Sequence, residues 1–194
     1  TNPGWSQDGK HIAYISNEDG NTALWVLDVP GAAKHRVDPN TLDFIEPVGT
    51  LAISVVDENG KPLDARVSVT GADGRRWAPA TALMHADDSL DRSERHYEVG
   101  YYHTSGMSTL TVPAGEHTVQ VTRGLEYAVS TQRVQVSAKG AKTVRATMRR
   151  LVNLPASGWY SGDLHVHMNY GGTYRTVPMQ LAFMARAEDL HVIE

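Results

Sequence analysis

The stretch Thr50-Leu51-Ala52-Ile53-Ser54-Val55-Val56-Asp57 alternates larger apolar side chains with small or polar ones along most of its length. Successive side chains of a strand point to opposite faces of a sheet, so this alternation predicts a strand with one buried face. The turn residues Asn59 and Gly60 follow it, and residues 65–69 resume the alternation. A strand, a glycine-bearing turn and a second strand indicate the beginning of an antiparallel sheet.

Further strand candidates follow before residue 150, and glycines separate them. They cover residues 108–112, 117–122, 130–136 and 143–148. Short strands with turn signals at this spacing are typical of an antiparallel β-sandwich, for which we expect roughly seven strands. We therefore assign residues 48–150 to such a sandwich.

Two short patterns in this region carry a resemblance to known modules. They are Asp57-x-x-Gly60-x-Pro62-x-x-Ala65 and Val112-Pro113-Ala114-Gly115-Glu116. Both resemble transthyretin-like or carboxypeptidase-regulatory-like modules. The resemblance implies a domain that supports or binds, and it says little about chemistry.

The N-terminal region contains two strand candidates, residues 11–16 and 23–29, on either side of a turn. The stretch Trp5-Ser6-Gln7-Asp8-Gly9-Lys10, with the later Leu24-Trp25-Val26, resembles one repeat of the TolB-type β-propellers. Because the sequence holds one copy and a propeller needs several blades, this resemblance implies a last blade. Residues 1–47 are thus expected to be a blade piece followed by a linker over residues 32–47.

Residues 163–168 alternate polar and apolar side chains, so that Asp163, His165 and His167 share one face of a predicted strand. Side chains at this spacing lie about 6–7 Å apart at Cβ, close enough for two imidazoles to bind one metal ion. Asp163 is placed to bind the metal or to orient a ring. The alternative is a half-exposed strand whose histidines contact only water.

A glycine-bearing loop at residues 169–175 follows, then a predicted helix over residues 179–189 and a second strand over residues 190–193. A strand, helix and strand of this length form a βαβ unit, whose strands are parallel. The fold class predicted for the chain is mainly β. It consists of an antiparallel β-sandwich flanked by a propeller-type hairpin and by the first βαβ unit of a truncated α/β barrel.

The stretch Gly162-Asp163-Leu164-His165-Val166-His167 resembles the first metal-binding motif of the polymerase-and-histidinol-phosphatase (PHP) metallohydrolases, which belong to the amidohydrolase-like barrels. With its flanking residues it is similar to the branch of carbaryl-type carbamate hydrolases. The resemblance implies that residues 151–194 begin a barrel and that His165 and His167 bind a divalent metal, with zinc preferred over manganese or iron. The family's other ligands and acid-base groups lie on later strands, so the catalytic residues stay unassigned.

This resemblance implies a metal-dependent hydrolase, in which a metal-activated water attacks an ester, amide, carbamate or phosphoester bond of a small-molecule substrate. Two strands cannot close a barrel, so we expect these 194 residues to be an inactive fragment of a longer protein. Whether the chain itself is an enzyme is left open. The alternative is a non-catalytic binding or scaffolding module of a TolB-like propeller protein.

Composition excludes several classes of partner. Lys and Arg total 18 against 22 for Asp and Glu, and no basic run offers a phosphate-binding stripe, so nucleic acid is not expected. No stretch approaches the ~20 apolar residues of a membrane span, and the absence of Cys excludes disulfides. We expect a periplasmic or secreted protein whose signal would lie upstream, and oligomerisation is left open.

The connection over residues 80–105 is rich in acidic residues and histidines. Two hypotheses apply: the segment covers the mouth of the expected barrel, or it is a solvated excursion whose histidines contact water, which we favour. The residues concerned are His85, Asp87, Asp88, Asp91, Glu94, His96, Glu98 and His103.

Overall fold

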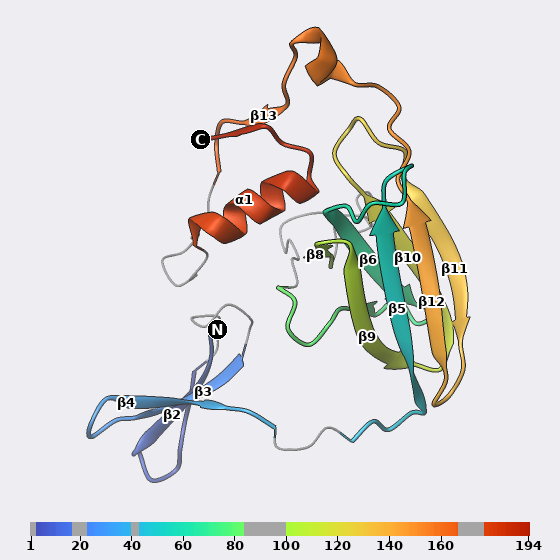
Figure 1. Cartoon of the computed structure of the whole chain (residues 1–194). Coiled ribbons are helices and arrows are strands. Elements are labelled where there is room, and N and C mark those ends of the chain that lie inside the picture. The colour runs from blue at the N-terminus through green and yellow to red at the C-terminus, as the bar shows by residue number, and fades with distance from the viewer. Residues whose placement is uncertain (1–2, 17–22, 40–42, 84–99, 167–176) are drawn as a thin grey trace. The chain divides into compact units, whose positions relative to one another are not determined.

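The computed structural model describes residues 3–16, 23–39, 43–83, 100–166 and 177–194 (Figure 1). The chain divides into two compact units. Unit 1 consists of Thr1–Asp43 and His167–Val177, and unit 2 of Phe44–Val166 and Pro178–Glu194. The expected division at residues 1–47, 48–150 and 151–194 stays a prediction.

Unit 1 contains an antiparallel sheet of strands β1 (Gly4–Trp5), β2 (His11–Ser16), β3 (Ala23–Asp28) and β4 (Ala33–Val37), paired in that order. The predicted pairing of the strands at 11–16 and 23–29 is confirmed, with Tyr14 opposite Trp25. Strand β4 lies inside the predicted linker, so that part of the prediction is wrong. All five β4 residues are exposed, and the strand therefore lacks the burial pattern by which a sequence reveals a strand.

Unit 2 is built on a β-sandwich of a five-stranded and a three-stranded sheet, which confirms the mainly β prediction. The five-stranded sheet has the order β11-β10-β6-β7, with β8 also paired to β6, and the other sheet has the order β12-β5-β9. The strands are β5 (Val48–Val56), β6 (Ala65–Gly71), β7 (Arg76–Trp77), β8 (Tyr102–Thr104), β9 (Met107–Pro113), β10 (Gly115–Thr122), β11 (Ser130–Val136) and β12 (Ala141–Thr147).

One pair of strands departs from the expected antiparallel pattern. Strands β5 and β12 run parallel, with Ile53 opposite Val144. Parallel neighbours need a long connection, and here the whole of β6 to β11 lies between them. The strand that opens the sandwich and the strand that closes it therefore lie side by side in one sheet.

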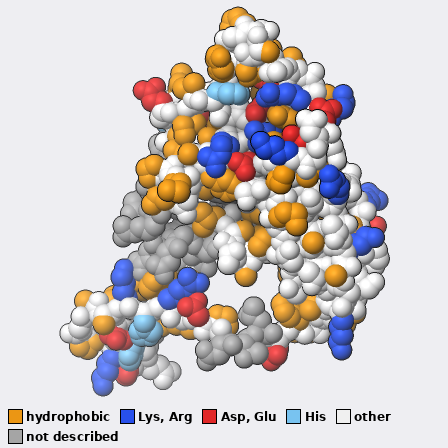
Figure 2. Space-filling model, viewed as in Figure 1, with side chains coloured by type: hydrophobic (Ala, Val, Ile, Leu, Met, Phe, Trp, Pro, Cys, Tyr) orange, Lys and Arg blue, Asp and Glu red, His pale blue; other side chains and the backbone are white. Residues whose placement is uncertain are grey.

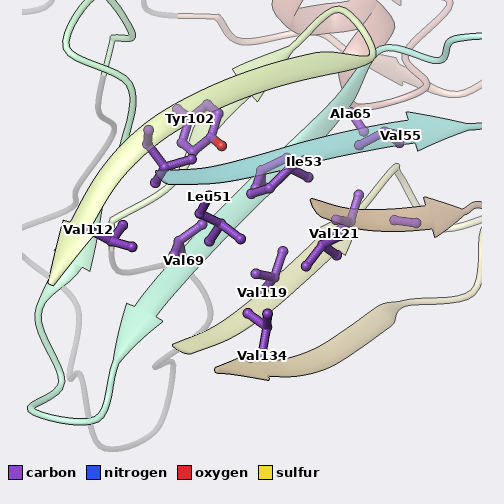
Figure 3. Close-up of a cluster of buried hydrophobic side chains, with 14 of the residues drawn as sticks. Leu51, Ile53, Val55, Ala65, Val69, Tyr102, Val112, Val119, Val121 and Val134 are labelled. Atoms are coloured by element: carbon purple, nitrogen blue, oxygen red, sulfur yellow. The ribbon is translucent and has the colours of Figure 1, made fainter. Parts of the chain in front are cut away.

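The core of the sandwich forms where the buried faces of the two sheets meet. Leu51, Ile53 and Val55 of β5 alternate with more exposed neighbours and are fully buried. Figure 3 shows them near Val119 and Val121 of β10, in the opposite sheet. The alternation that predicts β5 from the sequence is thus the pattern of residues that fill the core.

The C-terminal part of unit 2 contains a 3₁₀ turn (Leu154–Ser157), strand β13 (Gly162–Asp163), helix α1 (Pro178–Ala187) and strand β14 (Val192–Ile193). The predicted helix is present, and β13 and β14 pair in parallel as predicted. Each of these strands has two residues, however, so the strand predicted over residues 163–168 is wrong for residues 164–166, which follow the end of β13. The described residues form no barrel. Among the described helices, none combines the length and hydropathy that crossing a bilayer requires.

Candidate functional site

Two acidic residues that are adjacent in the chain, Glu188 and Asp189, directly follow helix α1 and lie against the sandwich. Both side chains are largely buried. Acidic groups at the C-terminal end of a helix are disfavoured by the helix dipole. Their position therefore requires compensating partners, and the sandwich supplies them.

Glu188 binds two residues of neighbouring strands. Its Oε1 lies 2.6 Å from Nε of Arg66 in β6 and 2.7 Å from Nε2 of His103 in β8. Arg66 and His103 are direct cross-strand neighbours, so the pairing of β6 with β8 places both donors at one point. Burial opposes ionisation of Glu188, but the hydrogen bonds from His103 and Arg66 outweigh it and lower the pKa of this carboxyl.

Asp189 binds two arginines that follow other strands of the sandwich. Its Oδ1 lies 3.1 Å from Nη2 of Arg123, and its Oδ2 lies 2.7 Å from Nη2 of Arg150. Burial alone would lower the pKa of Arg150, but the hydrogen bond and charge of Asp189 raise it. The same Nη2 of Arg150 also lies 3.3 Å from Oε2 of Glu126. The carboxylate of Asp189 thus has a charged partner on each oxygen.

The backbone that follows β10 also lies close to the end of helix α1. Nη1 of Arg123 donates to the carbonyl oxygens of Asp64 and Arg186. Gly124 has a φ of +53°, and a Cβ placed on it would lie 2.5 Å from the carbonyl oxygen of Glu188. A side chain at position 124 would therefore push the end of α1 away from the sandwich.

We call the six residues that make these contacts the docking cluster. They are Arg66, His103, Arg123, Arg150, Glu188 and Asp189. Figure 2 shows basic and acidic side chains side by side in unit 2. The cluster can hold two segments of the chain together by ion pairs.

The metal ligands predicted from the sequence are not tested by the structure. His165 follows β13 and is exposed, and its backbone N–H donates to the carboxylate of Asp163 at 3.0 Å. His167 lies outside the described residues. Within the described ranges, no three His, Cys, Asp or Glu residues gather closely enough to hold a metal ion. Zinc binding by His165 and His167 stays a prediction.

For the connection over residues 80–105, the favoured hypothesis was that its histidines contact only water, and the structure contradicts this for one of them. His103 does not contact only water, because its side chain is 6% exposed and bonded to Glu188. The other seven residues named for that connection lie outside the described residues. Sequence reasoning missed the docking cluster, although a pair of acidic residues at the end of a predicted helix is a signal for partners elsewhere in the fold.

No family model and no curated protein matches the chain. Similar solved structures include the minor pilin of Streptococcus agalactiae, with 15% identity, a TM-score of 0.39, and coverage of 68% of this chain and 61% of the pilin. The Bacillus anthracis TIE protein has 16% identity and a TM-score of 0.36, with coverage of 84% and 29%. The shaft pilin of Lactobacillus rhamnosus GG has 12% identity and a TM-score of 0.34, with coverage of 78% and 71%.

The chain therefore spans less than two thirds of the length of the first two proteins. These likenesses are distant, and no assembly or activity of this chain is derived from them.

The expected membership of the PHP or amidohydrolase-like metallohydrolases, and of the TolB-like propellers, is thus wrong. No family model supports either resemblance, and the described residues form a β-sandwich without a barrel. The main functional prediction, a metal-dependent hydrolase with a small-molecule substrate, is corrected with it. The six-residue motif around His165 is short, and a short motif occurs in unrelated sequences by chance. The alternative, a non-catalytic binding or scaffolding module, agrees better with the findings, without the propeller.

Proposed function

We propose that this chain is a non-catalytic scaffolding module, whose β-sandwich holds the described C-terminal segment of unit 2, residues 154–166 and 178–194, in one fixed orientation. The docking cluster is the observation that carries this proposal. Its acidic residues are adjacent in the chain, whereas its basic residues come from β6, β8 and the segments that follow β10 and β12. Two adjacent acidic residues thus bind partners from four separate parts of the sandwich.

The docking cluster attaches the segment to the sandwich, and it also determines which residues of the segment lie against the sandwich. Glu188 and Asp189 each contact two partners, so sliding the segment by one residue would separate at least one buried carboxylate from its partners. Leaving a buried charge unpaired costs about 3–5 kcal/mol. Alternative positions of the segment are therefore strongly disfavoured, as a scaffold requires.

The beginning of the segment is attached by the same part of the sandwich. Oε2 of Glu126 accepts a hydrogen bond from the backbone N–H of Leu154 at 3.2 Å, and it also pairs with Arg150. Further along, the hydroxyl of Ser161 donates to the carbonyl oxygen of Asp189. The segment is therefore attached near its beginning and again at the end of α1.

Limited proteolysis tests this proposal. In the double variant Glu188→Gln with Asp189→Asn, trypsin should cleave after Arg186 at least about tenfold faster than in the wild type, because helix α1 opens more often. The matched control is Asp73→Asn, which removes an exposed carboxylate paired with Arg75 and should leave the rate unchanged. Equal cleavage of the double variant and the wild type would reject the scaffolding role.

The proposal includes two further expectations from the sequence. One is a periplasmic or secreted location, which fractionation of cells expressing the full-length protein checks directly. The other is self-association, which sedimentation velocity of the purified chain measures. A monomer at all concentrations would remove oligomerisation from the proposal and leave the docking role intact.

A further inference from the structure

A cavity of about 460 Å³ lies in unit 2 next to the docking cluster. Its lining comes from Pro79 and residues 81–83, from β8 with the beginning of β9, and from helix α1. His103 belongs to both features, since it lines the cavity and bonds Glu188 through Nε2. The volume falls within the range of about 300–1,000 Å³ that is usual for small-molecule sites.

One part of the cavity wall carries neutral polar groups. Ser105, Ser108 and Thr109 contribute hydroxyls, and Gln180 of α1 contributes a carboxamide. The hydroxyl of Ser108 is fixed by a 2.8 Å hydrogen bond with the hydroxyl of Tyr102. These groups both donate and accept hydrogen bonds, which matches a ligand that does the same.

Another part of the wall is apolar. Helix α1 contributes Phe183 and Met184, and Leu83 adds an aliphatic side chain. The ring of Phe183 meets the ring of His103 edge to face, with the centroids 6.2 Å apart. An aromatic ring in a fixed orientation offers a flat surface to the C–H groups of a ligand.

The charge of the wall narrows the class of ligand. Of the described residues that line the cavity, none is Lys, Arg, Asp or Glu. An ionised ligand would lose part of its hydration there and would find no Lys, Arg, Asp or Glu side chain in the described part of the wall to pair with, which is unfavourable. A pure hydrocarbon would cover the exposed hydroxyls of Ser105 and Thr109 without bonding them, which costs about 1–3 kcal/mol for each group left unsatisfied. The wall thus favours a neutral ligand with both hydroxyl groups and an apolar face.

We propose that this cavity binds a neutral saccharide of one or two rings. The C–H face of a sugar ring would lie toward Phe183, and its hydroxyls would bond the Ser, Thr and Gln side chains. This inference goes beyond the scaffolding role and rests on different residues, apart from the shared His103. Its failure would leave the docking cluster as it is.

Methionine methyl NMR provides the test, because two of the methionines line the cavity. Met107 and Met184 are in its wall, Met148 is in the sandwich core, and Met179 is an exposed residue of α1 outside the lining. The probes are glucose, galactose, N-acetylglucosamine and maltose, with glucose 6-phosphate as the charged comparison. We expect saturable shifts of Met107 and Met184 with at least one neutral sugar and a Kd of about 1 mM or tighter. The Met148 and Met179 signals should stay in place.

Two variants locate the effect. Phe183→Ala removes the aromatic surface and should weaken sugar binding at least about tenfold, as should Gln180→Leu, which keeps the size of the side chain and removes its hydrogen bonds. The control is Met179→Ala on the same helix, which should bind as the wild type does. An unchanged Met148 signal shows that each variant is folded. No saturable shift with any neutral sugar, equal binding by Phe183→Ala, or tighter binding of glucose 6-phosphate than of glucose would overturn the proposal.

Discussion

The guanidinium Nε of Arg66 lies 2.6 Å from Oε1 of Glu188, although 122 positions separate the two residues in the chain. Arg66 lies in β6 of the sandwich, and Glu188 follows helix α1. The pair is partly buried, with 25% and 20% of the two side chains exposed. A partly buried ion pair such as this one connects the sandwich to the C-terminal segment more effectively than an exposed ion pair would.

Replacing Glu188 by Gln should lower the free energy of unfolding of unit 2 by about 1–3 kcal/mol, because Arg66 and His103 lose a charged acceptor. Urea unfolding followed by circular dichroism measures the change. Asp73→Asn is the control, since its pair with Arg75 is exposed and should contribute less than about 1 kcal/mol. Equal effects of the two substitutions would show that the pairing of Glu188 adds no stability.

Replacing Gly124 by Ala should loosen the end of α1, because the new methyl group would lie 2.5 Å from the carbonyl oxygen of Glu188. The left-handed backbone conformation adds a separate cost of about 1–2 kcal/mol. Gly74→Ala is a matched control, with a φ of +80° and nothing within 4 Å of the added Cβ. The two variants share the backbone cost, and thermal unfolding should show a larger loss for Gly124→Ala. A loss no greater than that of Gly74→Ala would mean that the close approach at Gly124 adds nothing.

The contribution of Glu188 should depend on pH. Its pKa is lowered in the folded chain from an ordinary value near 4.5, because the hydrogen bonds from His103 and Arg66 outweigh the effect of burial. A group whose pKa is lowered on folding stabilises the fold above its unfolded pKa and loses that effect as the pH falls through its folded pKa. The stability difference between the wild type and Glu188→Gln should therefore be full above about pH 4.5 and shrink in more acidic solution. A difference that grows on acidification would contradict this assignment.

Zinc binding by His165 and His167 is expected to be weak. Two imidazoles fall short of the usual three protein ligands of a catalytic zinc site or four of a structural one. Calorimetry with zinc should therefore give a Kd weaker than about 1 µM. Substituting both histidines by Ala should abolish the residual binding. Tight binding that survives the double substitution would assign the metal to other residues.

Parts of this fold can be read from the sequence because burial leaves a pattern. The alternation of Leu51, Ile53 and Val55 predicts β5, and the same residues fill the core. Strand β4 leaves no such pattern, since every residue in it is exposed. The parallel pairing of β5 with β12 is also hidden, because it depends on how the whole sandwich closes.

The docking cluster is a tertiary feature, and the sequence gives only an indirect sign of it. Nothing local connects Arg66 to Glu188, and their contact depends on the pairing of β6 with β8 and on the placement of α1. The sign that was available is the acidic pair at the end of a helix, where the helix dipole disfavours it. The short motif around His165 was more conspicuous and less informative, because six residues specify neither a fold nor a complete metal site.

Hydrogen exchange in a variant altered only on the sandwich tests the scaffolding role most directly. The double variant Arg66→Met with Arg150→Met replaces each arginine by a long, uncharged side chain. Methionine keeps much of the packing of the arginine's aliphatic part but cannot form the ion pair. We predict that amide protection in α1 falls at least about tenfold, although no residue of the helix has changed, while β5 and β10 keep their protection. Unchanged protection in α1 would contradict the claim that the sandwich holds this segment, and so would an equal loss across β5 and β10.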